Sequence, residues 1–277
     1  MKQYAGKWVY ITGGSSGIGK ACARAFLREG ANVLIISRDS EKLESALLEL
    51  EKERTREDQR VLSLSVDVSR GEDVREAFSG WLENHPAPDV LITSAGMAYP
   101  NYFEKIPDEI FDKTIDVNLK GNWYVIHTLY PHMRATGGGY IVLVSSMAGY
   151  IGVFGYTAYS ASKYGIIGMA SCLRSEAELD NIAVSVLCPP DTDTPQLAEE
   201  NKTKPEETKA VSGTVKPVSA DFVAEGLLKG MRKKRFLITP GLEGSIIEKI
   251  NRHFPNLVYK INQSAVKKAA RKRGKSV

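Results

Sequence analysis

Residues 7–30 read KWVYITGGSSGIGKACARAFLREG and join a short apolar run, a glycine-rich turn and a helical pattern. The run KWVYIT (7–12) is rich in β-branched and aromatic residues, which is typical of a buried strand. Apolar residues then recur at helical spacing from Ile18 to Phe26, and Gly30 predicts the end of that helix. A strand, a glycine-rich turn and a helix in this order begin a βαβ unit.

The same alternation continues along the chain. Short runs rich in Val, Ile and Leu are separated by helical patterns and lie at 32–37, 61–66, 89–94, 140–146, 183–188 and 235–239. This pattern predicts an α/β fold, a Rossmann-type doubly wound parallel sheet of about seven strands in the order 3-2-1-4-5-6-7. We expect a single dinucleotide-binding catalytic domain over 1–241, with a polar, proline-containing lid loop at 189–217. A helical, basic C-terminal segment, 242–277, follows it.

The composition, with 43% hydrophobic and 25% charged residues among 277, is ordinary for a soluble globular protein. Three cysteines lie far apart and without metal-binding spacing, so we expect a reducing compartment, no disulfide framework and no metal site. The N-terminus has no apolar signal region. The uncharged segment 135–162 is long enough for a membrane span, but its Gly, Ser and Thr content indicates strand, loop and helix instead. A cytoplasmic protein is expected.

The positive charge is concentrated at the C-terminal end. Nine Lys or Arg and no acid follow Glu248, which exceeds the net charge of +4 of the whole chain. Apolar residues recur at helical spacing over 242–254 and, beyond Pro255, over 257–265. An apolar face followed by basic residues is typical of a segment that lies on an anionic membrane surface, which predicts a peripheral position on the cytoplasmic face. The alternative is a helix that packs in an oligomer and ends in a solvated basic segment. Nucleic-acid binding is not expected, because the tail lacks interleaved aromatic residues.

The glycines of the first turn, Gly13, Gly17 and Gly19, form a G-x-x-x-G-x-G motif. Glycine allows the backbone to turn tightly and to approach a pyrophosphate, whose charge is met by free amides at the helix N-terminus. Because the motif follows the first strand of a βαβ unit, it predicts a dinucleotide site.

The end of the second strand indicates which dinucleotide binds. NAD sites usually offer an acid to the ribose 2′-hydroxyl there, whereas this chain has Ser37 and Arg38. An arginine pairs with a 2′-phosphate, and Ser37 and Ser15 can donate further hydrogen bonds, so NADPH/NADP is favoured. The alternative is that Arg38 is a solvated residue beside a helix capped by Asp39.

The segment YTAYSASKYG (156–165) offers two tyrosines and one lysine. On a helix, Tyr159 and Lys163 stand four apart on one face, whereas Tyr156 lies about a turn further away. A free tyrosine has a pKa of about 10, and a lysine ammonium nearby favours the phenolate. Taken alone, this spacing favours the simpler interpretation that both tyrosines are packing residues with a polar tip.

TGGSSGIG, Asn118 in VNLKGN, Ser146 in VSSMAG, and Tyr159 with Lys163 together resemble the short-chain dehydrogenase/reductase family over about residues 5–240. The interval of thirteen residues from Ser146 to Tyr159 matches the family's spacing and selects Tyr159 over Tyr156 and Ser146 over Ser145. The resemblance implies that Tyr159 donates a proton to the ketone oxygen and that Ser146 hydrogen-bonds this oxygen. It further implies that Lys163 holds the nicotinamide ribose, that Asn118 holds a water linking Lys163 to solvent, and that Tyr156 forms a wall of the substrate pocket.

The resemblance also implies a set of cofactor contacts. Two positions depart from the family, because TSAG (93–96) stands for NNAG and a second proline stands at 190 in place of glycine. The implied cofactor-binding residues are Gly13, Ser15, Ser16, Gly17, Ile18, Gly19, Ser37, Arg38, Asp67, Val68, Ala95, Gly96, Tyr159, Lys163, Pro189, Thr192 and Thr194.

Within the family, PPDTDTPQLAEENKTKPEET (189–208) with FGYTAYSASKYG (154–165) looks like the 3-ketodihydrosphingosine reductases. This resemblance implies the NADPH-dependent reduction of 3-ketosphinganine, a long-chain keto-amine lipid, to sphinganine. It also implies a homodimer or homotetramer built through the helices after the fourth and fifth strands. The acids near the site are Asp191, Asp193, Glu199 and Glu200, and of these we expect Asp193 to recognise the substrate amine. The alternative is that these acids cap turns or face water. Reduction of β-ketoacyl groups, steroids or retinoids stays open, as does a dinucleotide-sensing regulator on the same fold.

Overall fold

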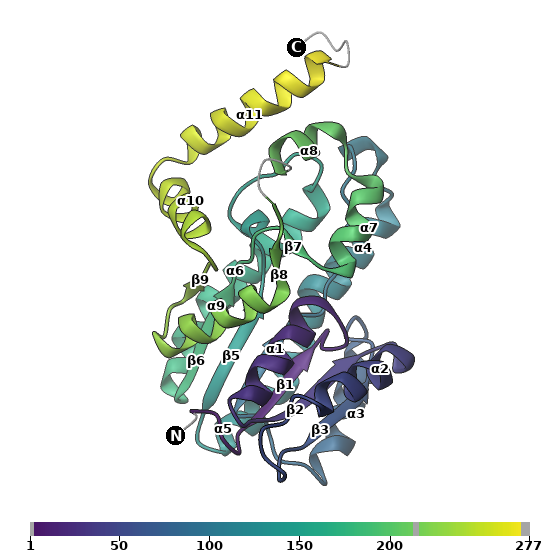
Figure 1. Ribbon diagram of the computed structural model, residues 1–277, viewed down its shortest axis with the longest axis vertical. Helices are drawn as coiled ribbons and strands as arrows, with labels where there is room; N and C mark the ends of the chain where they lie inside the picture. Colours follow the sequence, from purple (N-terminus) through teal and green to yellow (C-terminus); the bar gives the residue numbers. More distant parts are fainter. Residues whose placement is uncertain (1–2, 213–215, 273–277) are drawn as a thin grey trace.

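The computed structural model describes residues 3–212 and 216–272. A seven-stranded parallel sheet runs through the molecule, and its strand order confirms the sequence prediction (Figure 1). In order across the sheet, the strands are β3 (Val61–Ser65), β2 (Asn32–Ser37), β1 (Trp8–Thr12), β4 (Val90–Thr93), β5 (Gly139–Val144), β6 (Ile182–Leu187) and β9 (Leu237–Ile238). The last strand is β9 because β7 (Thr192–Asp193) and β8 (Val218–Ser219) pair only with each other, in a separate two-stranded sheet.

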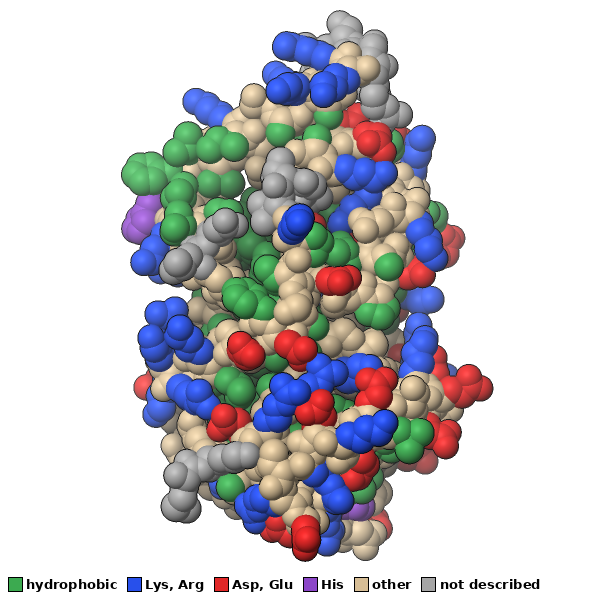
Figure 2. All heavy atoms as spheres, viewed as in Figure 1, with side chains coloured by type: hydrophobic (Ala, Val, Ile, Leu, Met, Phe, Trp, Pro, Cys, Tyr) green, Lys and Arg blue, Asp and Glu red, His purple; other side chains and the backbone are tan. Residues whose placement is uncertain are grey.

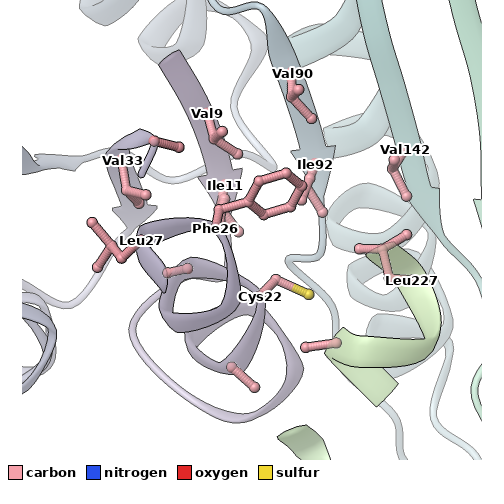
Figure 3. Packing of buried hydrophobic residues seen from close by; sticks show 14 of the residues in the cluster. Val9, Ile11, Cys22, Phe26, Leu27, Val33, Val90, Ile92, Val142 and Leu227 are labelled. Carbon is pink, nitrogen blue, oxygen red and sulfur yellow. The ribbon is translucent and has the colours of Figure 1, made fainter. Parts of the chain in front are cut away.

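Helices cover both faces of the sheet, as its buried strands require. Successive side chains of β1 point to opposite faces, so Ile11 packs beneath Phe26 on one face (Figure 3), whereas Tyr10 packs with Phe78 on the other. Each such fully buried side chain contributes about 1.5–3 kcal/mol. One layer consists of α1 (Gly17–Arg28), α2 (Ser40–Glu51) and α9 (Ala220–Arg232), and the other of α3 (Gly71–Leu82), α5 (Gly121–Ala135) and α6 (Thr157–Leu179).

Short irregular turns connect several of these elements. Helix α4 (Asp108–Ile115) continues through a π-helical turn, η2 (Asp116–Lys120), into α5. Such turns often lie at functional sites, and this one contains Asn118. The 3₁₀ turns are η1 (Phe103–Lys105) and η3 (Met147–Gly149).

The segment 189–217, expected as a loop, contains helices α7 (Pro195–Thr203) and α8 (Glu206–Ser212) in addition to the strand β7. The prolines of this segment predict a loop. Pro195, however, occupies the first turn of α7, where the backbone N–H that proline lacks would have no hydrogen-bond partner within the helix. The Thr194 hydroxyl caps this helix by accepting a hydrogen bond from the Leu197 amide at 3.2 Å. The same residue types that indicate loops therefore start a helix here.

The C-terminal segment forms two helices, α10 (Leu242–His253) and α11 (Pro255–Lys272), with Pro255 at the break that the sequence predicted. Helix α11 lies against α8 and α10 at the upper end of the molecule (Figure 1). It buries Val258, Val266 and Ala270. Two of the nine basic residues of this segment, at positions 273 and 275, lie outside the described residues. Within the described parts of the chain, no helix is long and apolar enough to cross a bilayer.

Candidate active site

The carboxyl ends of the parallel strands open into a cleft of about 880 Å³. In open α/β sheets, ligands bind at this edge, where the strand order reverses between β1 and β4. The cleft is bounded by the turn after β1, the segments after β4 and β5, the start of α6, the chain from Pro189 into α7, and the two C-terminal helices. The site therefore combines residues from the whole length of the chain.

The turn after β1 forms a cradle that only glycine fits. Gly13 has φ +68°, and a β-carbon there would lie 2.8 Å from the Ala95 amide nitrogen. A β-carbon on Gly19 would lie 2.3 Å from the Gly13 carbonyl oxygen. Ser16 stands at the N-cap of α1 without a side-chain cap, and Gly17 and Ile18 of the first turn line the cleft. This close backbone and these helix-start amides fit a pyrophosphate.

The end of β2 carries no acid free to bind a ribose. Arg38 is exposed, and Asp39 is used as the N-cap of α2, where it accepts a hydrogen bond from the Lys42 amide at 3.1 Å. Asp39 therefore caps the helix, as the alternative interpretation expected. The exposed Arg38 side chain can still bind a 2′-phosphate. Although partial burial works to raise it, hydrogen bonds from Ser69, together with the nearby guanidinium of Arg38, hold the pKa of Asp67 below its usual value.

Asn118 is fully buried and connects two segments of the site. Its side chain accepts a hydrogen bond from the Met97 amide at 2.8 Å and donates to the Met97 carbonyl and to the Ser162 hydroxyl, both at 2.9 Å. A β-carbon on Gly96 would lie 3.3 Å from Asn118 Oδ1 and 3.6 Å from Lys163 Nζ. The bare backbone of Gly96 therefore separates these two polar groups.

The two serines after β5 have different partners. The Ser145 hydroxyl is buried and donates to the Lys163 carbonyl at 2.9 Å, which fixes α6 against the sheet. The Ser146 hydroxyl accepts a hydrogen bond from the Ala148 amide at 3.1 Å, and its side chain is near enough to Tyr159 to act downward on the pKa of that residue. Ser146 is thus the serine that is directed at the tyrosine, in agreement with the spacing argument.

Tyr159 and Lys163 lie on one face of α6, as the sequence predicted. The Lys163 ammonium donates to the Val144 carbonyl at 2.9 Å and lies 5.5 Å from the centre of the Tyr159 ring. Burial lowers the pKa of Lys163 to about 8. The expected decrease in the pKa of Tyr159 is not found, because burial, and next the negative charge of Glu200, raise it above its usual value.

Tyr156 is tied to the wall of the cleft. It stands at the N-cap of α6, and its hydroxyl donates to Glu200 Oε2 at 2.5 Å. Burial, and next Glu200, raise the pKa of Tyr156 above its usual value. Its ring lies 5.6 Å from that of Tyr159, so it forms a wall beside the central tyrosine.

The acids after β6 are not placed as expected. In the short strand β7, Thr192 is buried and the next side chain, Asp193, points outward, so Asp193 is exposed and lies outside the cleft lining. Glu199 is also exposed and pairs with Lys202. The acids that line the cleft are Asp191 and Glu200. The choice of Asp193 is therefore corrected, because strand alternation turns it away.

Several expected residues meet in the cleft and several do not. Its lining includes Gly13, Ser16, Gly17, Ile18, Gly19, Ala95, Gly96, Ser146, Tyr156, Tyr159, Lys163, Pro189, Thr192 and Thr194. Outside the lining lie Ser15, Ser37, Arg38, Asp67, Val68 and Asn118. Sequence reasoning missed Gln196 and Lys204, although their spacing of four on either side of Glu200 places all three on one helical face.

Hydrophobic side chains gather over α10 and the start of α11 beside the cleft (Figure 2). We call this surface the apolar tail patch; it consists of Ile246, Ile250, Phe254, Leu257 and Ile261. Ile247 and Asn262 of the same two helices line the cleft. Basic side chains of the later part of α11 lie at the top of the molecule (Figure 2).

Comparison with known proteins places these features in a family. The family model for short chain dehydrogenase matches residues 7–205. A 3-ketodihydrosphingosine reductase of Mus musculus is 38% identical over 246 residues, which cover 88% of this chain and 74% of the relative. A 3-dehydrosphinganine reductase of Danio rerio is 40% identical over 243 residues, which cover 87% of this chain and 73% of the relative.

A solved structure has the same fold. The short-chain dehydrogenase from Sphingobium yanoikuyae in complex with NADPH aligns with a TM-score of 0.76, covering 91% of this chain and 95% of its own. The two sequences are 24% identical, so this likeness concerns the fold.

Proposed function

The chain belongs to the short-chain dehydrogenase family, and we propose that it reduces the ketone of 3-ketosphinganine to sphinganine with NADPH. The observation that carries this proposal is the meeting of a glycine cradle with Ser146, Tyr159 and the buried Lys163 in one cleft. Relatives named for this activity match most of the chain at 38% and 40% identity, which supports the choice of substrate.

When bound, NADPH would supply a hydride for the reduction of the ketone carbon. Negative charge then develops on the ketone oxygen, and Tyr159 donates its hydroxyl proton to it. A high pKa suits Tyr159 to this task, because the proton stays on the phenol until an alkoxide is present to take it. Ser146 donates a hydrogen bond to the same oxygen. Lys163 holds the nicotinamide ribose, and its ammonium favours the phenolate that remains after transfer.

The residues of the cradle would hold the pyrophosphate, and Arg38 with Ser37 and Ser15 would hold the 2′-phosphate. Asp67 and Val68 would bind the adenine. Thr192, Thr194 and Pro189 lie in the cleft where the nicotinamide end would be held. We assign to Asn118 the water that relays protons between Lys163 and solvent, next to Gly96.

The apolar tail patch suits an enzyme whose substrate carries a long alkyl chain. Phe254 is 63% exposed and Ile261 is 60% exposed, and α10 and α11 also contribute to the cleft lining. We assign this patch, with the basic side chains of α11, to peripheral contact with an anionic membrane. The substrate would then enter the cleft from the lipid side, and the protein would lie on the cytoplasmic face.

An oligomer is supported by a second exposed apolar surface. Trp123 on α5 is 54% exposed, Tyr164 on α6 is 46% exposed and Phe111 on α4 is 43% exposed. These helices follow the fourth and fifth strands, where the sequence resemblance places the contact. A homodimer or homotetramer through this surface would bury these rings.

The function is tested with purified protein, NADPH and a panel of ketones comprising 3-ketosphinganine, a β-ketoacyl thioester and a steroid ketone. We expect loss of NADPH absorbance with 3-ketosphinganine and formation of sphinganine, measured by mass spectrometry. Reduction of the thioester or the steroid alone would overturn the substrate assignment. Absence of turnover with all three ketones, with NADPH still bound, would favour a dinucleotide sensor.

A further inference from the structure

Two carboxylates line the cleft on the wall formed by the chain from Pro189 into α7. Glu200, on α7, is 7% exposed, and Asp191 lies in the segment before β7. Glu200 Oε1 accepts a hydrogen bond from the Gln196 amide at 2.9 Å, and Oε2 accepts from Tyr156 at 2.5 Å. These bonds fix the carboxylate, since both donors are part of the same wall.

The charge at this wall is not balanced. The only cation placed within ion-pair distance of these two acids, among residues 3–212 and 216–272, is Lys204, whose Nζ lies 3.7 Å from Asp191 Oδ2 and 3.8 Å from Glu200 Oε2. The side chain of Lys204 is 3% exposed and does not belong to the cleft lining. Two carboxylates and one ammonium leave one net negative charge at this wall, and the side chain of Asp191, which is 40% exposed, is the more open of the two acids. This surplus negative charge attracts a cationic group of a ligand.

The other lysines of the cleft do not supply this charge. Lys163 is directed to the Val144 carbonyl at the cofactor end, and Lys216 is exposed at the rim. The unbalanced carboxylate pair is therefore a local feature of the wall formed by Asp191 and α7.

The wall is also close to the reacting atoms. Gln196, which donates a hydrogen bond to Glu200, is near enough to Tyr159 to act downward on its pKa, and the rings of Tyr156 and Tyr159 lie 5.6 Å apart. The negative charge of Glu200 is the largest influence after burial on the pKa of Tyr159. A cation bound at Glu200 would therefore lie beside the ketone that Tyr159 protonates.

We infer that Glu200, supported by Asp191, binds the ammonium group that 3-ketosphinganine carries on the carbon next to its ketone. This inference rests on the proposed function and makes Glu200 a specificity-determining residue for ketones with an adjacent amine. The ammonium would complete the charge balance of the wall, while Tyr156 and Gln196 hold the carboxylate in place.

The test compares Glu200→Gln with Glu199→Gln, using two substrates. One substrate is 3-ketosphinganine, and the other is the same chain with hydrogen in place of the amine. Because a hydrogen bond to a charged group contributes about 1.5–3 kcal/mol, Glu200→Gln should lower kcat/KM for the amine substrate about 10- to 100-fold. It should change kcat/KM for the deaminated ketone little, since the glutamine oxygen still accepts a hydrogen bond. Glu199→Gln, an exposed neighbour, should change neither value.

A further variant, Glu200→Asp, keeps the charge and should retain more activity on the amine substrate than Glu200→Gln. An equal loss on both substrates in Glu200→Gln would overturn the inference and leave Glu200 as a structural support of the wall. Equal kcat/KM of the unaltered protein for the two substrates would overturn it as well. Failure of the unaltered protein to reduce either ketone would instead count against the proposed function, so the two failures are distinguishable.

Discussion

One wall of the cleft is made by the ends of parallel strands and the start of α6, whereas the other is made by α7, α10 and α11. The first wall is anchored by buried hydrogen bonds to the sheet, such as that from Lys163 to the Val144 carbonyl. In the second wall, α10 and α11 pack on each other outside the sheet, and they expose Phe254 and Ile261. The difference indicates a division of labour, in which the strand ends hold the reacting groups and the outer helices select the substrate.

The largest expected effect tests the chemical role of the first wall. Tyr159→Phe should lower turnover at least about 100-fold, because it removes the general acid, while NADPH binding measured by fluorescence is retained. Tyr164→Phe, a substitution at a half-exposed tyrosine of the same helix, should leave turnover close to that of the unaltered protein. Near-normal turnover of Tyr159→Phe would show that Tyr159 is not the proton donor. The first wall would then not be distinguished by holding the reacting group.

The second prediction concerns the free energy that the folded protein loses by burying the charged Lys163 in the first wall. Burial lowers the pKa of Lys163 from 10.5 to about 8, so between these values the folded protein binds fewer protons than the unfolded chain. The free energy of unfolding should therefore rise with pH through this window, whereas the full cost is present below pH 8. Relative to Lys163→Met, the rise should be on the order of 2–3 kcal/mol. Tyr159 and Cys188 are present in both proteins, so their contributions to the pH dependence of the unfolding free energy largely cancel in the difference.

Denaturant unfolding at three pH values within this range, without cofactor, measures the difference between the two proteins. Parallel stability profiles would mean that Lys163 is solvated in the folded protein. In that case the charged groups of the first wall would be as accessible to solvent as those of the second.

The third prediction concerns the far end of the cofactor site, which lies outside the cleft lining. Arg38→Asp should raise the Kd of NADPH about tenfold more than that of NADH, because only NADPH has a 2′-phosphate to lose. Arg75→Asp, an exposed substitution on α3, is the matched control and should affect both cofactors equally and little. Equal weakening of both cofactors by Arg38→Asp would contradict the assignment.

The sequence predicted the first wall far better than the second. Gly13 and Gly19 are required by the backbone itself, and Tyr159 with Lys163 needs only helical spacing, so local rules were sufficient for these positions. Asp193 lies outside the cleft lining, which the sequence does not indicate, because the two-residue strand β7 is too short to be recognised from an alternating pattern. The pKa of Tyr159 was also misjudged, since burial and the charge of Glu200 arise from tertiary contacts between α6 and α7.

The smallest expected effect concerns the apolar tail patch of the second wall. The intact protein should co-sediment with anionic liposomes at low salt and should be released at high salt, because basic residues of α11 contribute through screened attraction. Phe254→Ser should weaken binding about three- to tenfold, since one exposed aromatic side chain no longer enters the lipid interface. Leu179→Ser is the matched control, because Leu179 is 89% exposed at the end of α6 and lies outside the patch, so binding should not change. A point substitution is preferable to removal of α11, which would uncover α8. If the intact protein does not bind at low salt, the patch is a packing surface for another copy of the chain, and the second wall would then receive its substrate from solution.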